Sequence, residues 1–210
     1  MEYRGGKRFL KSWKPIKKGN KQPILVIPGL TASPWSTGLL RSFLNSEDFI
    51  AYDWGLGRNL GNLNDVESLE ETLVKINEQH QSKVVIIGWS LGGIYARRLG
   101  QKREELTKSV ITLGSPYRDI RSPNYASCFF NLLQKLRGNT SEPEWANTLH
   151  EPLSMPTIAF YSKKDGIVPW EACYDPDDET EHSNIEVHTS HFGMGASEEV
   201  LHTLLNQLYI

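Results

Sequence analysis

The chain has 210 residues, of which 39% are hydrophobic and 23% are charged, a composition typical of a folded domain with a substantial core. Its net charge of −2 excludes an overall attraction to nucleic acid, so we expect no nucleic-acid partner. The sequence lacks the run of about 20 apolar residues that spans a membrane and the apolar core of a signal peptide. Two cysteines are too few for a disulfide framework, and the sequence therefore predicts a cytoplasmic protein.

Residues 1–22 form a basic N-terminal arm with eight lysines and arginines and one acidic residue, Glu2. Apolar side chains lie between these charges, at Tyr3, Phe9, Leu10, Trp13 and Ile16. A basic amphipathic segment of this kind can make weak contact with an anionic membrane surface. The alternative, which we favour, is that the aromatic side chains pack on the domain while the lysines stay in water.

From residue 23 onward, apolar strands alternate with amphipathic helices at short intervals. This alternation is typical of a mostly parallel sheet with helices on both faces, and the whole chain, 1–210, is expected to form one such α/β domain. The first helix is expected to begin with Ser33 as N-cap and Pro34 as its first residue. Counting the apolar runs gives about six strands, at residues 23–30, 49–52, 84–87, 109–113, 156–161 and 184–188.

Two segments interrupt this alternation at the ends of predicted strands. The glycine-rich stretch 54–61 lacks the spacing of a phosphate-binding or dinucleotide-binding loop, and we interpret it as the wall of a cleft. Residues 117–153 contain three prolines and a short apolar segment around Phe129 and Phe130. An insertion at this point lies over the carboxyl edge of the sheet, where ligands of open α/β sheets bind. It is therefore predicted to be a small helical cap.

The stretch around Ser90 has the pattern of a nucleophile elbow. Four β-branched residues at 84–87 lead into Gly88-Trp89-Ser90-Leu91-Gly92-Gly93, and a helical pattern follows from Ile94. A serine in such a strand-to-helix turn is lifted clear of the sheet. The N-terminus of the helix beside it favours an oxyanion. Ser90 is therefore the candidate nucleophile.

A serine hydroxyl needs a base to accept its proton and an acid to hold that base in the right tautomer. His191 follows the last predicted strand, at the edge of the sheet where Ser90 emerges, and is the candidate base. Asp165 follows the strand at 156–161 and is the candidate acid, with Asp119 as the alternative. The other histidines lie in predicted helices, in the cap, among surface acids or inside a strand (His80, His150, His182, His188 and His202).

With these residues in place, residues 23–208 resemble the α/β-hydrolase superfamily, and more closely its compact bacterial esterase and lipase branch. The resemblance rests on short motifs at 27–30, 54–61, 88–93, 114–116, 164–169 and 190–194. It implies the α/β-hydrolase fold and an oxyanion hole made by the backbone N–H groups of Leu30 and Leu91. Pro28-Gly29 stands where many relatives have His-Gly, but a backbone donor survives that change. The chain starts near the family's third strand, so the antiparallel edge is either missing or replaced by residues 1–22.

These features predict a serine hydrolase that cleaves carboxylic esters through an acyl-enzyme on Ser90. The substrate would be a small-molecule or lipid-like ester, and the reaction requires no metal or organic cofactor. An acyltransferase, a thioesterase or an amidase would use the same triad, and a non-catalytic binding protein on this fold is a further alternative. The oligomeric state is not predicted. Candidate substrate-binding residues for an apolar pocket are Trp35, Trp89, Phe129, Phe130 and Trp170.

Overall fold

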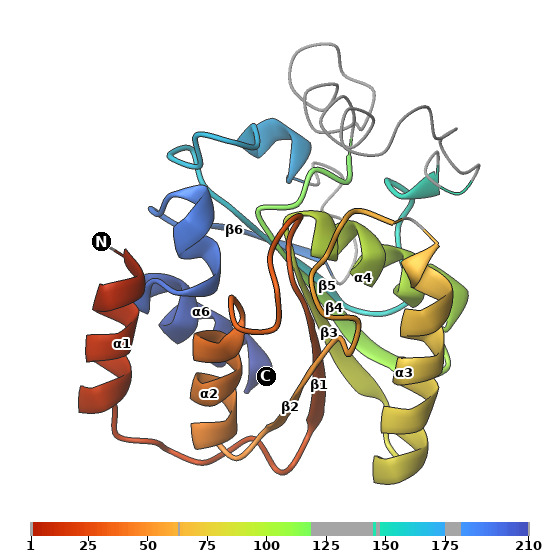
Figure 1. Ribbon diagram of the computed structural model, residues 1–210, viewed down its shortest axis with the longest axis horizontal. Coiled ribbons are helices and arrows are strands. Elements are labelled where there is room, and N and C mark those ends of the chain that lie inside the picture. Colours follow the sequence, from red (N-terminus) through yellow and green to blue (C-terminus); the bar gives the residue numbers. More distant parts are fainter. Residues whose placement is uncertain (1, 63, 119–144, 146–147, 175–181, 210) are drawn as a thin grey trace.

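The structure of the protein is a computed structural model that describes residues 2–62, 64–118, 145, 148–174 and 182–209. Six strands form one sheet in the order β2-β1-β3-β4-β5-β6 (Figure 1). Every pair of neighbouring strands is parallel, which confirms the predicted parallel sheet. The strands are β1 (Pro23–Ile27), β2 (Ile50–Asp53), β3 (Val84–Trp89), β4 (Thr107–Leu113), β5 (Thr157–Tyr161) and β6 (His182–Glu186).

The strand order places a crevice at the carboxyl edge of the sheet. β1 and β3 are neighbours at the centre, and every residue of both strands is buried. The chain leaves β1 toward one side of the sheet and leaves β3 toward the other, which makes this pair the topological switch point. The loops that follow β1 and β3 therefore separate at the point where ligands of open α/β sheets bind.

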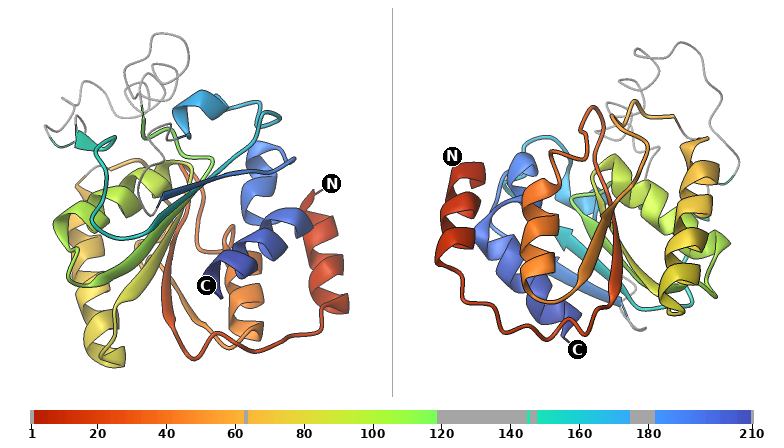
Figure 2. Two further views of the ribbon diagram at one scale, coloured as in Figure 1. Left: turned by 180° about the vertical axis from the view of Figure 1, so that it is seen from behind. Right: turned by 60° about the horizontal axis from the view of Figure 1, so that its bottom comes forward.

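Helices cover both faces of the sheet (Figures 1 and 2). On one face lie α3 (Asp65–His80) and α4 (Leu91–Lys102), whose apolar stripes pack with Leu25, Ile86 and Val110 in one core. On the other face lie α1 (Glu2–Ser12), α2 (Gly38–Ser46) and α6 (Glu198–Leu208), which pack with a second core. Two short 3₁₀ helices, η2 (Trp170–Ala172) and η3 (His191–Gly195), follow β5 and β6.

The N-terminal arm forms a helix that packs on the domain. Phe9, Leu10 and Trp13 contact the core between α2 and α6, as the favoured interpretation of this segment requires. The described part of the arm, residues 2–22, contains no strand, and β2 forms this edge of the sheet. Within the described residues the sheet has no antiparallel strand at this edge, and the arm does not supply one.

The predicted start of α2 is wrong. The helix begins at Gly38, after a turn over residues 34–37 in which the Gly38 N–H donates to the Trp35 carbonyl at 3.1 Å. The Thr37 hydroxyl donates to the Pro34 carbonyl at 3.2 Å, and Ser33 is not the N-cap. Local hydroxyl hydrogen bonds of this kind compete with helical ones, which delays the helix by one turn.

The predicted position of His188 inside the last strand is also wrong. β6 ends at Glu186, and His188 lies beyond it as an exposed residue whose Nδ1 atom is 3.1 Å from Glu199 Oε1. Most of the predicted cap, including Phe129, Phe130 and the alternative acid Asp119, lies outside the described residues. In the ranges that are described, every helix is too short or too polar to cross a membrane.

Candidate active site

Ser90 occupies a strained turn between β3 and α4. Its backbone has φ 54° and ψ −122°, a conformation that a residue other than glycine rarely adopts and that costs roughly 1–3 kcal/mol. The turn also requires close backbone approach, because a Cβ atom on Gly92 would lie 2.3 Å from the Ile27 carbonyl oxygen. The side chain is 6% exposed, at the start of a 12-residue helix. This geometry matches the predicted nucleophile elbow.

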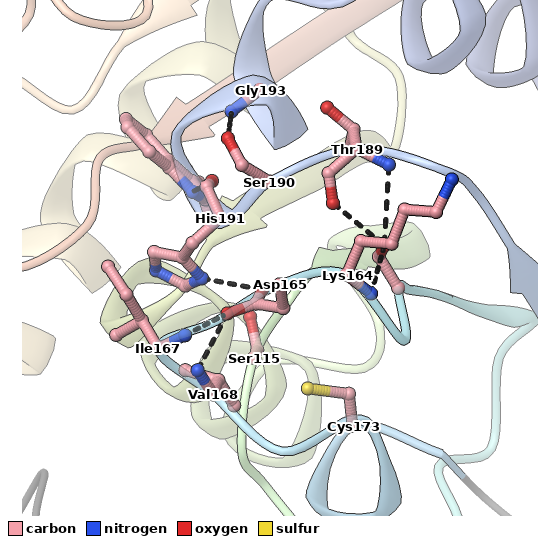
Figure 3. A network of polar contacts seen from close by, with 12 residues as sticks. Ser115, Lys164, Asp165, Ile167, Val168, Cys173, Thr189, Ser190, His191 and Gly193 are labelled. Carbon is pink, nitrogen blue, oxygen red and sulfur yellow. Dashed lines mark hydrogen bonds and ion pairs between the residues drawn. The ribbon is translucent and has the colours of Figure 1, made fainter.

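His191 and Asp165 form a buried pair. The His191 Nδ1 atom lies 2.7 Å from Asp165 Oδ2, and the His191 backbone N–H donates to the Asp165 carbonyl at 3.0 Å (Figure 3). The other carboxylate oxygen, Oδ1, accepts the backbone N–H groups of Ile167 at 2.9 Å and Val168 at 2.6 Å. Because the carboxylate only accepts hydrogen bonds, the Nδ1 atom of His191 carries the proton and its Nε2 atom is left to accept one.

Side chains hold the loops of this pair together. The Ser162 hydroxyl donates to the Thr189 carbonyl at 2.7 Å and accepts the Lys164 backbone N–H at 3.1 Å, which links the segment after β5 to the segment after β6. The Trp89 indole N–H donates to the His191 carbonyl at 3.1 Å, so the residue before the nucleophile contacts the residue that carries the base. These bonds fix the imidazole relative to Ser90.

The two candidate oxyanion donors lie on either side of Ser90. Leu91 is the first residue of α4, and a Cβ atom on Gly29, which precedes Leu30, would lie 3.2 Å from Ser90 Cβ. Within the described part of the chain, neither the Leu30 nor the Leu91 backbone N–H has a hydrogen-bond acceptor. Both groups are therefore available to a negatively charged oxygen beside Ser90.

Asn59 supports the Leu30 loop, and the sequence did not single it out. Its side-chain amide is fully buried, donates to the Pro28 carbonyl at 2.8 Å and accepts the Gly61 N–H at 2.9 Å. Its backbone pairs with Thr31 and Ala32. The glycine-rich stretch 54–61 thus packs beneath the Leu30 loop, and the signal that could have found Asn59 is a lone asparagine between turn residues at the carboxyl edge of the sheet.

Ser90 and His191 line one pocket of about 380 Å³. Apolar side chains make up most of the rest of its wall, among them Leu30, Trp89, Ile167 and Phe192. Of the predicted substrate-binding residues within the described ranges, only Trp89 contributes to this wall.

The two other described tryptophans of that prediction lie elsewhere. Trp35 is 71% exposed, and Trp170 packs against Tyr161 and Tyr174.

The described residues contain no group of three histidine, cysteine or acidic side chains that could hold a metal ion. Cys173 is also near Asp165, but burial, together with the charges of Asp165 and Glu171, raises the pKa of its thiol well above the ordinary value, so it is a poor nucleophile.

The chain is similar in fold to solved structures of lipases and esterases along most of its length. Among solved structures, monoacylglycerol lipase from Paleococcus ferrophilus is 16% identical with a TM-score of 0.65, covering 90% of this chain and 95% of its own. Bacillus licheniformis lipase in its mature form is 15% identical with a TM-score of 0.67, covering 94% and 95%. A lipase-esterase related protein from Clostridium acetobutylicum is 17% identical with a TM-score of 0.61, covering 91% and 96%.

At these identities the solved structures establish the fold. The sequence matches no curated protein. The model of the α/β hydrolase family matches residues 24–198, a segment that runs from β1 to the start of α6 and contains Ser90, Asp165 and His191. The chain therefore belongs to the α/β hydrolase family.

Proposed function

We propose that this protein is a serine hydrolase that cleaves carboxylic esters through an acyl-enzyme on Ser90. The observation that carries the proposal is the buried His191–Asp165 pair, because His191 lines a pocket together with a serine that is held in a strained turn at a helix N-terminus. Hydrolase-family membership and an apolar pocket wall support an ester with an apolar acyl group.

The proposed reaction begins when His191 Nε2 accepts the proton of Ser90 Oγ as that oxygen attacks the ester carbonyl carbon. The carbonyl oxygen becomes an oxyanion, which accepts hydrogen bonds from the Leu30 and Leu91 N–H groups. The tetrahedral intermediate then collapses, the C–O bond to the alcohol breaks, and His191 gives its proton to the leaving alcohol. Asp165 stabilises the imidazolium that exists between these two transfers.

Hydrolysis completes the cycle. A water molecule loses a proton to His191 and attacks the acyl carbon, and the second tetrahedral intermediate expels Ser90 Oγ, which recovers its proton from His191. The products are the free acid and the resting enzyme. Residues on four loops, after β1, β3, β5 and β6, take part, and all four loops leave the same edge of the sheet.

The test is the hydrolysis of p-nitrophenyl esters of increasing chain length, together with labelling by a fluorophosphonate, which modifies activated serines. We expect Ser90→Ala to lower kcat by at least about 10⁴-fold and to abolish labelling, since the chemistry loses its nucleophile. Ser68→Ala, on the exposed face of α3, is the matched control and should keep both signals. Full esterase activity in Ser90→Ala, or no labelling of the wild-type protein, would contradict the proposal.

A further inference from the structure

The helix α1 has two faces with opposite chemistry. Gly6, Phe9, Leu10 and Trp13 turn toward the domain, where Gly6 lies against the Ala196 backbone and the three larger residues pack on the core. These positions are three and four residues apart, as one side of a helix requires. The arrangement fixes the rotation of α1 about its own axis, and with it the direction of every other side chain of the helix.

The opposite face of α1 is a stripe of cations. Arg4, Lys7, Arg8 and Lys11 are again spaced by three and four residues, and all four are exposed. The stripe is about 10 Å long, from the rise of a helix per residue. The segment that follows α1 continues it with exposed lysines at 14, 17 and 18. We call these seven residues the cationic stripe.

The net positive charge is confined to the N-terminal arm, because the chain as a whole is slightly acidic. Residues 1–22 contain eight basic residues and one acidic residue, a net charge of +7, whereas the whole chain has −2. The remaining 188 residues therefore carry a net charge of −9. An acidic molecule with one positive surface approaches an anionic partner with that surface first, so α1 would face the partner.

The helix that carries the stripe packs against η3, which lines the active-site pocket. α1 contacts both α6 and η3, and Figure 1 shows the N-terminus next to the segment that follows β6. η3 carries Phe192, which is 69% exposed and lines the pocket together with Ile167, which is 54% exposed. The helix that carries the cations is therefore a neighbour of the segment that carries an exposed apolar side chain of the pocket.

We propose that the cationic stripe docks this protein on an anionic lipid surface, with the mouth of the pocket facing the lipid. Charge attracts the stripe to the headgroups, and the apolar residues beside it enter the interface. A nucleic acid could pair its phosphates with the cations of the stripe, but it would leave the apolar side chains of Phe192 and Ile167 in water. The presence of both cations and exposed apolar side chains therefore favours a lipid surface. Docking does not depend on the chemistry of Ser90.

The test uses the full chain with Ser90→Ala, so that binding is measured without turnover, in sedimentation with lipid vesicles. We expect binding to vesicles of equal parts phosphatidylglycerol and phosphatidylcholine, none to phosphatidylcholine alone, and loss of binding as salt is raised. The triple variant R4Q/R8Q/K11Q should bind about a hundredfold more weakly, since each cation near an anionic surface contributes roughly fivefold.

The matched control, K75Q/K83Q/K108Q, removes three exposed lysines from other parts of the molecule and should bind as the parent does. Both triple variants should keep the parent's thermal midpoint, because the altered side chains are exposed. Equal binding by both triple variants, no binding to anionic vesicles at low salt, or tighter binding to single-stranded RNA than to these vesicles would overturn the proposal. Esterase activity is measured separately, on the wild-type protein. The result for membrane binding therefore does not decide the result for ester hydrolysis, and the reverse also holds.

Discussion

At the scale of single residues, the proposed oxyanion hole depends on a side chain that never touches the substrate. The Leu30 loop follows β1 without regular structure, and Asn59 holds it by accepting from Gly61 and donating to the Pro28 carbonyl. Both bonds are fully buried, so water cannot replace them. Asn59 is a positioning residue for the Leu30 N–H group.

We expect Asn59→Ala to lower kcat by about tenfold with little change in KM, because a loosened Leu30 N–H weakens stabilisation of the transition state. The loss should be smaller than the roughly 10²-fold to 10³-fold lost when an oxyanion donor is removed outright. The free energy of unfolding should fall by about 1–3 kcal/mol, since the Pro28 carbonyl is left unpaired. Steady-state kinetics and urea unfolding measure these effects.

Asn64→Ala is the matched control for Asn59→Ala. Asn64 is exposed at the start of α3, and its side chain makes no capping hydrogen bond. Its loss should change neither kcat nor stability measurably. A fall in stability without a fall in kcat for Asn59→Ala would mean that Asn59 supports the fold but not the donor.

The site residues differ in how far the sequence predicts them, and the reason is physical. Ser90, Asp165 and His191 each follow a strand, and parallel strands bring such positions to one edge. Asn59 acts through contacts between two loops, and the local signal, an asparagine between turn residues, does not show which carbonyl its side chain binds. Trp35 was predicted from its residue type alone, and residue type does not determine which way a loop side chain turns.

At the scale of elements, α4 connects the nucleophile to both ends of the predicted cap, 117–153. Arg97, on the buried face of α4, donates from Nε to the Leu149 carbonyl at 2.7 Å and from a terminal nitrogen to the Glu151 carbonyl at 2.8 Å. Its guanidinium also lies over the Tyr117 ring, 4.0 Å from the centroid. The helix that starts at Leu91 therefore fixes residues just before and just after the stretch 119–144.

We expect Arg97→Lys to lower the free energy of unfolding by about 1–3 kcal/mol, because an ammonium cannot reach two carbonyls and cover a ring at once. Arg98→Lys is the matched control, since the Arg98 guanidinium lies over the Trp145 ring, 5.5 Å from its centroid, and is less buried. Thermal unfolding of the two variants gives the comparison. Equal midpoints would contradict a structural role for the buried guanidinium.

The helices and strands differ in how well the hydrophobic pattern of the sequence predicts them. Runs such as residues 84–87 predict their strands because both faces of a central strand are buried. The helix α1 was not predicted as a helix, since its two glycines and the repulsion between its closely spaced cations disfavour one, and packing on α2, α6 and η3 stabilises it. The late start of α2 has a local cause. A hydroxyl side chain just before the helix hydrogen-bonds to a backbone carbonyl, and this favours a turn over the first helical turn.

At the scale of the whole molecule, Glu47 joins the two ends of the chain. Its carboxylate, at the C-terminal end of α2, is buried and accepts the Trp13 indole N–H and the Ile16 and Lys17 backbone N–H groups, the last two at 3.0 and 2.9 Å. The Tyr209 hydroxyl donates to it from the C-terminus at 2.5 Å. One buried acid thus adds hydrogen bonds to the apolar packing that attaches the arm with the cationic stripe.

Burial raises the pKa of Glu47, but the hydrogen bonds from Tyr209, Trp13, Lys17 and Ile16 outweigh it, and the pKa falls below its ordinary value of 4.5. A lowered carboxylate pKa stabilises the folded state above the unfolded pKa, and this contribution is lost as the pH falls through the folded pKa. Burial and the same hydrogen bond raise the pKa of Tyr209 to about 12. The contribution of its proton is complete below pH 10.0, the ordinary value, and is lost as the pH rises through 12.

We therefore expect Glu47→Gln to lower the free energy of unfolding by about 2 kcal/mol at pH 7, because a neutral amide accepts these hydrogen bonds less strongly than a carboxylate does. The difference from wild type should shrink as the pH falls below 4.5, where the wild-type carboxyl also becomes neutral. Urea unfolding at a series of pH values measures it, with the exposed Glu78→Gln as control. A difference that stays constant down to the lowest pH would show that Glu47 acts through its shape and not its charge.

Trypsin should also cut the Glu47→Gln variant faster than the wild-type protein within residues 7–21, since the arm opens locally before the domain unfolds.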